Sequence, residues 1–200
     1  MNDSLKSFLS SSEIIDWETD EIVALAKQLR DNSFDQVSIA KASFDWVRDE
    51  IKHTVDFALQ DVTCTASEVL RLGTGLCYAK SHLLAALLRA NEIPAGLCYQ
   101  RLSMDGNGPP YCLHGFNAVY LPTIGWYRVD ARGNKSGIYC VFSPPREVLA
   151  FVPSLPEEQT FPEIWAEPLD IVVKSLQRHE SCDDVCRDLP DMRPSDVHAD

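Results

Sequence analysis

The chain from Gly73 to His82 constrains the fold most, because a cysteine there follows two glycines and begins a helical pattern. The segment reads Gly-Thr-Gly-Leu-Cys-Tyr-Ala-Lys-Ser-His. Glycines permit tight backbone turns ahead of the helix. Residues 77–91 then repeat leucines at helical spacing, which predicts a helix with one buried face. The leucines of this face are Leu83, Leu84, Leu87 and Leu88.

A shorter helix is predicted just before this segment, with both of its ends marked. Thr65 and Glu68 have the spacing of a capping box. Gly73 suits the position just past a helix end, where positive φ is common. Cys77 in the first turn of the next helix faces the positive end of the helix dipole, which favours thiolate over thiol. Cys77 is therefore a candidate nucleophile, although most buried cysteines are ordinary core residues.

Downstream, two segments rich in aromatic and β-branched residues predict an antiparallel hairpin. They run from Leu113 to Leu121 and from Trp126 to Ala131, with a turn at Pro122–Gly125. Folding at this turn brings the start of the first strand beside the end of the second, so His114 and Asp130 are expected neighbours. A cysteine at a helix start, with histidine and aspartate on adjacent strands, is the arrangement that nucleophilic acyl transfer requires.

The stretch from about Ala66 to Gly137 resembles the transglutaminase-like superfamily, papain-related cysteine enzymes with a Cys-His-Asp triad. The order and spacing of its pieces carry the resemblance. The pieces are Gly75-Leu76-Cys77 entering a helix, the leucine stripe, Asn91 to Ala95 leading into a strand, Ala118-Val119-Tyr120 ending the histidine strand, and Gly125 to Asp130. The resemblance implies Cys77 as nucleophile, His114 as base and Asp130 as the orienting acid.

The resemblance favours hydrolysis or small acyl transfer over protein crosslinking. The chain lacks room for the extra domains of calcium-dependent transglutaminases, and Tyr78 follows the cysteine where those enzymes usually have tryptophan. The expected substrate is a peptide, a protein or a small amide or ester, cleaved through a thioester. The alternative is a non-catalytic module on the same fold that binds a peptide or protein. A redox-sensing thiol protein would need a second cysteine close to Cys77.

The predicted fold is α+β, with a transglutaminase-like, papain-like core in which the cysteine helix packs on an antiparallel sheet beside additional N-terminal helices. One domain is expected over residues 1–178, with a triad-bearing core at about 64–142 and an acidic, flexible tail at 179–200. The other expected elements are helices at Asp20–Arg30, Gln36–His53 and Leu169–Gln177, a strand at Ala95–Arg101, a fourth strand at Ile138–Phe142, and a short helix over Glu147–Phe151.

Four further residues are predicted to contact substrate: Tyr78, Lys80, Gln100 and Arg132. Lys80 shares the leucine face of its helix, and an ion pair with an acid is favoured for a lysine there. A side chain on the strand after the cysteine helix, such as Gln100, could help to hold an oxyanion. Arg132 could bind a substrate carboxylate, although pairing with an acid is favoured.

Three more polar residues receive a structural prediction. His53 ends a helix, where a cation complements the helix dipole. His82 lies opposite the leucine face and is expected at the surface or against a loop. Asn117 lies on the strand face opposite His114, and is therefore a poor third member of the site.

Composition excludes several classes of partner. The net charge of −12 disfavours nucleic acid, which needs a basic face. No stretch approaches the ~20 apolar residues of a membrane span, and no secretory signal begins the sequence. The seven cysteines have no disulfide-scaffold spacing, so we expect reduced thiols and a cytoplasmic protein. No cofactor or metal is expected, because the acidic terminal segment with His179, Cys182, Cys186 and His198 lacks the closed loop of a zinc site.

Overall fold

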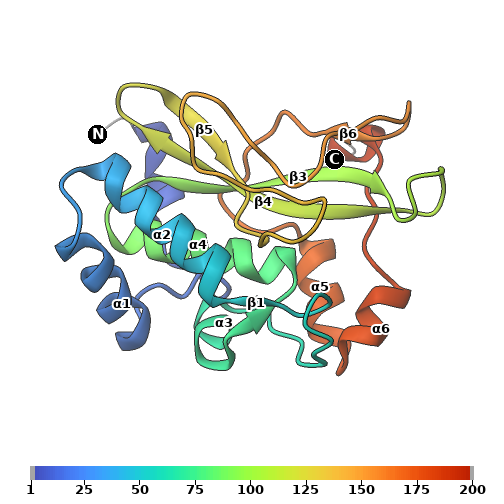
Figure 1. Ribbon diagram of the computed structural model, residues 1–200, viewed down its shortest axis with the longest axis horizontal. Coiled ribbons are helices and arrows are strands. Elements are labelled where there is room, and N and C mark those ends of the chain that lie inside the picture. Colours follow the sequence, from blue (N-terminus) through green and yellow to red (C-terminus); the bar gives the residue numbers. More distant parts are fainter. Residues whose placement is uncertain (1–2, 199–200) are drawn as a thin grey trace.

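A four-stranded antiparallel sheet carries helices α1 to α4 on one face in the computed structural model, which describes residues 3–198 (Figure 1). The strand order is β5-β4-β3-β6, and two further short strands, β1 and β2, pair in parallel. The strands are β1 (Lys52–His53), β2 (Thr74–Gly75), β3 (Ala95–Ser103), β4 (Tyr111–Leu121), β5 (Gly125–Val129) and β6 (Gln159–Thr160). The helices are η1 (Asp3–Leu9), α1 (Asp20–Asp31), α2 (Gln36–Glu50), α3 (Ala66–Leu72), α4 (Cys77–Ala90), α5 (Asp170–Arg178), α6 (Cys182–Arg187) and η2 (Pro194–His198).

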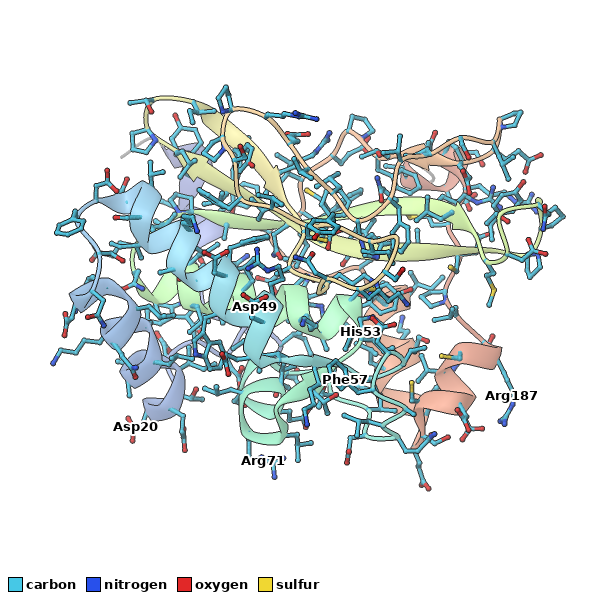
Figure 2. All side chains as sticks on the ribbon, in the orientation of Figure 1. Asp20, Asp49, His53, Phe57, Arg71 and Arg187 are labelled. Atoms are coloured by element: carbon cyan, nitrogen blue, oxygen red, sulfur yellow. The ribbon has the colours of Figure 1, made fainter. Side chains whose placement is uncertain are left out.

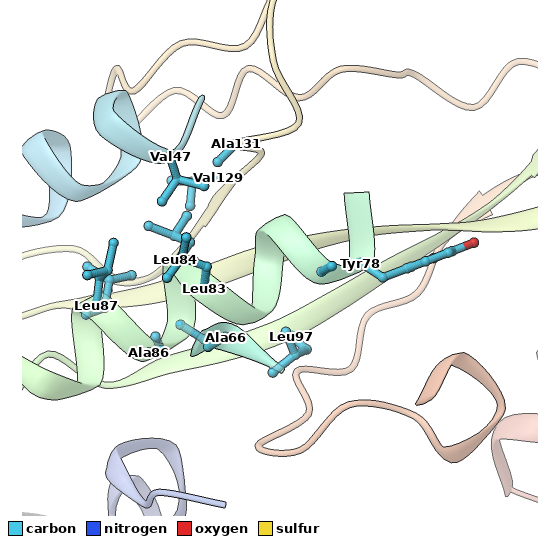
Figure 3. Packing of buried hydrophobic residues seen from close by; sticks show 14 of the residues in the cluster. Val47, Ala66, Tyr78, Leu83, Leu84, Ala86, Leu87, Leu97, Val129 and Ala131 are labelled. Atoms are coloured by element: carbon cyan, nitrogen blue, oxygen red, sulfur yellow. The ribbon is translucent and has the colours of Figure 1, made fainter. Parts of the chain in front are cut away.

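Helix α4 forms the centre of the molecule. It packs on β3 and β4, while α1, α2 and α3 pack around its other sides. Figure 3 shows Leu84 close to Val47 of α2 and to Val129 at the end of β5. All residues from Tyr78 to Arg89 are buried, so the predicted leucine face is only part of a helix enclosed on every side.

Buried polar side chains of α4 form hydrogen bonds with backbone carbonyl groups, which lowers the cost of their burial. Arg89 donates to the carbonyls of Ala95 and Ser10. His82 is fully buried, and its Nδ1 lies 2.7 Å from the carbonyl oxygen of Cys64. The expected loop contact of His82 is present, but its expected surface position is wrong. Because the partner is a backbone carbonyl, no charge pattern in the sequence predicts the contact.

The local signals around α3 are confirmed. Thr65 and Glu68 form both bonds of the capping box, and Gly73 ends the helix with a φ of 66°. Gly75 lies instead in β2 and needs no positive φ. A Cβ atom on it would come within 3.0 Å of Thr63 Oγ1 and 3.1 Å of Ala79 Cβ, so close packing explains this glycine.

Two predicted elements between residues 138 and 151 are wrong. Ile138–Phe142 forms no strand, and Cys140 N–H bonds to the side chain of Asn134 at 2.6 Å rather than to a neighbouring strand. Residues 147–151 are irregular, and β6 is the fourth strand of the sheet. Predicted Gln36–His53 is divided, since α2 ends at Glu50 and His53 belongs to β1.

The segment after Arg178 also differs from the expected flexible tail, except for residues 199–200, which lie outside the described part. Helix α6 buries Cys182 and Val185 in the main core. The N–H of Leu113 donates to the carbonyl of Pro190 at 2.7 Å, and Arg101 makes two 2.7 Å bonds to Asp191. These contacts fix the segment against β3 and β4.

None of the helices within residues 3–198 is long and apolar enough to cross a membrane.

Candidate active site

The structure brings Cys77, His114 and Asp130 together. Cys77 is the first residue of α4, His114 lies on β4, and Asp130 directly follows β5. His114 Nε2 lies 2.7 Å from Asp130 Oδ2. Cys77 is close enough to the imidazole to raise the pKa of His114. With Nε2 turned to the carboxylate, Nδ1 is the ring nitrogen left to face the thiol.

The backbone around His114 is pressed onto the first turn of α4. A Cβ atom on Gly115 would come within 2.9 Å of the Tyr78 ring, so only glycine allows this approach. On the other side of His114, the carbonyl of Leu113 accepts a hydrogen bond from the Tyr78 hydroxyl. Leu113 and Gly115, the two neighbours of His114, thus both contact Tyr78, which follows Cys77 in the chain. These contacts place the imidazole beside the thiol.

Asp130 is a buried carboxylate with its hydrogen bonds satisfied. Its exposed fraction is 0%. Oδ2 accepts from His114 and from Ala150 N–H at 3.0 Å, while Oδ1 accepts from Arg132 N–H at 3.1 Å. Burial by itself raises the pKa of Asp130, but the charge of His114 and these hydrogen bonds outweigh burial and lower it. The carboxyl group therefore stays ionised.

His114 is held as a cation by its two partners. Burial, the largest single influence, lowers its pKa. The charge of Asp130, the nearby thiol of Cys77 and the hydrogen bond to Asp130 outweigh burial and raise the pKa to about 10. A cation beside a thiol is the setting in which cysteine nucleophiles are activated.

The start of α4 leaves donors free for an anion. Its N-cap residue is Leu76, and no side chain caps the helix. The N–H groups of the first turn have no partner within a helix. An oxygen that gains negative charge beside Cys77 would therefore meet backbone donors and the positive end of the dipole.

A cleft of about 510 Å³ opens onto the thiol. Cys77 and His114 line it, and so do two of the four predicted substrate contacts, Tyr78 and Arg132. Tyr78 is buried and uses its hydroxyl on Leu113. Arg132 makes a bidentate pair with Asp56, with N–O distances of 2.5 and 3.0 Å.

The other two predicted contacts do not line this cleft. Gln100 is buried on β3 and donates to the carbonyl of Phe151 and the hydroxyl of Thr160. Lys80 lines an adjoining cavity of about 500 Å³. Its Nζ donates to the carbonyls of Arg48 and Ile51, so the predicted ion pair with an acid is wrong.

Lys80 thus caps the C-terminal end of α2, whose last carbonyls lack partners within the helix. Burial lowers the pKa of Lys80 to about 7.

Asn117 faces away from the site, as the strand alternation predicts. Its amide donates to the carbonyls of Ser81 and Gly96, which fastens β4 to α4 and β3.

The helix-end position of His53 predicted only a structural role, yet His53 lines both the cleft and the adjoining cavity. Figure 2 shows it beside the start of α4, where β1 pairs with β2. Burial first, and the charge of Arg132 second, lower its pKa to about 3. A neutral His53 makes no ion pair with Asp56 across 3.8 Å, and its buried Nδ1 has no hydrogen-bond partner in the described chain. The pairing of β1 with β2 brings His53 to the cleft, and the sequence pattern did not predict this pairing.

Two further thiols, Cys112 and Cys186, line the same cleft as Cys77. All seven cysteines are free, and Cys182 Sγ lies 3.9 Å from Cys186 Sγ. Within the described residues, no cluster of three or more His, Cys, Asp or Glu side chains could hold a metal ion.

A solved structure shares this fold at low sequence identity. A protein described as a "putative cysteine protease" from Cytophaga hutchinsonii matches with a TM-score of 0.53 and 22% identity, over 66% of this chain and 43% of that one. The periplasmic domain of TgpA from Pseudomonas aeruginosa matches with a TM-score of 0.46 and 21% identity, over 62% of this chain and 45% of that one. The chain thus spans less than half the length of either structure.

No curated protein matches the sequence. The model of the transglutaminase-like superfamily matches residues 23–131, more than half of the chain, and includes the helix start, the histidine strand and the aspartate described above. The chain therefore belongs to the transglutaminase-like superfamily.

Proposed function

We propose that this protein is a cysteine-dependent hydrolase or acyltransferase that cleaves an amide, isopeptide or ester bond through a thioester at Cys77. One observation carries the proposal: His114 interacts with a half-buried thiol on one side and lies 2.7 Å from the fully buried carboxylate of Asp130 on the other. A base that faces the nucleophile, with a third group that orients the base, is the geometry of covalent acyl transfer.

The first half-reaction forms the thioester. His114, as an imidazolium, already holds the proton of Cys77, and the thiolate sulfur attacks the substrate carbonyl carbon. The carbonyl oxygen becomes an oxyanion, which N–H groups at the start of α4 stabilise. The C–N or C–O bond then breaks, and His114 gives its proton to the departing amine or alcohol.

The second half-reaction releases the acyl group. His114 takes a proton from water or from an acceptor amine or alcohol, whose heteroatom attacks the thioester carbonyl. The C–S bond breaks, the product leaves, and His114 keeps the proton beside the Cys77 thiolate, which restores the starting pair. Asp130 keeps its charge throughout and stabilises the imidazolium, because its pKa is lowered.

Mass spectrometry of the intact protein tests this proposal directly. The wild type, incubated with a panel of p-nitrophenyl acyl esters, should gain the mass of one acyl group on Cys77. Cys77→Ala should gain none. Cys186→Ala is the matched control, because it removes another half-buried thiol from the same cleft, and it should acylate normally. Acylation that persists in Cys77→Ala, or that disappears in Cys186→Ala, would contradict the assignment.

A further inference from the structure

One wall of the cleft is apolar and comes from two segments that are distant in the sequence. Leu102 lies near the end of β3 and Met104 directly follows it, while Phe151 and Val152 belong to the irregular segment before β6. Glu158 joins the two segments, since it accepts hydrogen bonds from the N–H groups of Ser103, Ser154 and Leu155. We call Leu102, Met104, Phe151 and Val152 the apolar wall.

The charged groups around the cleft are already paired. Among the described residues that line it, these are His114, Arg132 and Glu158. His114 pairs with Asp130 and Arg132 with Asp56. Both oxygens of Glu158 accept backbone N–H groups. A charged substrate group would lose its hydration here without gaining a free counter-charge.

The cleft adjoins a more polar cavity. His53 and Val55 line both, and Asp49, Asp56 and Lys135 also line the cavity. A substrate that reaches from the apolar wall to this cavity therefore meets an apolar surface and a polar one. The thioester keeps the acyl group in place through both half-reactions, while the leaving group departs after the first. An apolar surface that binds the acyl group therefore acts in both half-reactions, whereas one that binds the leaving group acts only in the first.

We propose that the acyl group accepted by Cys77 is uncharged and apolar, an aliphatic chain or an apolar side chain next to the scissile carbonyl, and that it binds against the apolar wall. This specificity rests on the proposed function. Met104 and Val152 are exposed, at 48% and 84%, so the acyl group would cover apolar surface that water now contacts.

Three p-nitrophenyl esters of equal chain length test the charge requirement: hexanoyl, adipoyl (an anion) and 6-aminohexanoyl (a cation). The rate of Cys77 acylation is measured for each and divided by its rate with a small free thiol, which removes intrinsic reactivity. We expect hexanoyl to react more than about tenfold faster than either charged ester. From acetyl to hexanoyl, each added methylene should raise the normalised rate by up to about fourfold, the transfer value for a buried CH₂.

A pair of valine variants tests the location. Val152→Asp places a carboxylate on the apolar wall at an exposed position, so the fold should tolerate it. It should lower the hexanoyl rate and raise the 6-aminohexanoyl rate. Val23→Asp on α1, 44% exposed and remote from the cleft, should leave both rates unchanged.

The outcomes separate the two proposals. If Cys77 is acylated equally fast by all three esters, or if Val152→Asp leaves their order unchanged, the apolar specificity is wrong and the acyl-transfer function stands. If no ester acylates Cys77, the function itself is wrong and the specificity falls with it.

Discussion

Replacing Asp130 with asparagine tests the candidate triad most sharply, because the change keeps the side-chain size and removes the charge. The asparagine can place its oxygen where Oδ2 of Asp130 now accepts hydrogen bonds from His114 and from the N–H of Ala150. Its NH₂ group then faces the N–H of Arg132, where Oδ1 is now the acceptor. Asp130→Asn therefore loses one buried hydrogen bond and the charge that holds the imidazolium.

The structure sets the two magnitudes. A buried donor left without a partner costs about 1–3 kcal/mol, and a chain of this size loses about 2–4 °C in Tm per kcal/mol. We therefore expect a fall in Tm of about 2–12 °C. The acylation rate should fall by about 10- to 1,000-fold. In a serine protease triad the same change costs about 10⁴, but a thiol is already more nucleophilic than a hydroxyl.

The assay combines the rate of Cys77 acylation with thermal unfolding of the same samples. Asp16→Asn is the control, because the Asp16 carboxylate also accepts a backbone N–H and a hydroxyl, both from Ser67, but lies outside the cleft. It should lower Tm and leave acylation intact. An Asp130→Asn protein that acylates at the wild-type rate, or an Asp16→Asn protein that slows equally, would refute the role of Asp130.

Four other predictions follow from the same contacts. With iodoacetamide at pH 7, peptide mapping should find Cys77 modified first, because burial raises the pKa to about 12 for five other thiols: Cys64, Cys98, Cys112, Cys140 and Cys182. Equal labelling of these would contradict it. Since the pKa of His114 rises from 6.5 to about 10 on folding, its stabilisation is complete below pH 6.5 and is lost toward pH 10. In urea unfolding, the stability difference between wild type and Asp130→Asn should therefore shrink over that window, not widen. Lys80→Met should lower the unfolding free energy by about 1–3 kcal/mol, since the carbonyls of Arg48 and Ile51 lose their donor, without slowing acylation; a slow but fully stable variant would indicate a role in the reaction. Truncation after Arg178 should lower Tm, because it removes the acceptor of the Leu113 N–H and two buried core residues; an unchanged Tm would show that α6 contributes nothing.

Proximity of the triad could be predicted because short-range rules determine it. The hairpin turn and the alternation of its strands place His114 near Asp130, and the glycines and capping box place Cys77 at a helix start. The observed register is offset from direct pairing, since Asn117 pairs with Val129 and Asp130 therefore lies diagonal to His114. A 2.7 Å contact is still made, because diagonal neighbours remain within reach of long side chains.

The buried polar groups could not be predicted in the same way. Lys80 Nζ and His82 Nδ1 contact backbone carbonyls of residues 18 to 32 positions away in the chain, while the buried Nε2 of His82 has no hydrogen-bond partner among the described residues. Every residue has a carbonyl, so no residue type marks such a partner. The sequence pattern favours an acid for Lys80 and water or a loop for His82, and only the tertiary fold decides which groups these side chains contact. The cytoplasmic location, with its reduced thiols, stays a prediction.

The C-terminal segment shows how composition can hide a helix that supports the site. Its acidic residues suggested a solvated tail, yet apolar residues recur there at helical spacing, i, i+3, i+4 and i+7: Cys182, Val185, Cys186 and Leu189. Cys186 and Leu189 line the cleft. The next residue, Pro190, accepts the N–H of Leu113, whose carbonyl accepts the Tyr78 hydroxyl. The backbone beside His114 is therefore held from both sides, by Tyr78, which follows Cys77, and by the C-terminal segment. We expect a loosened segment to move the imidazole away from the thiol, because this acidic segment helps to position His114.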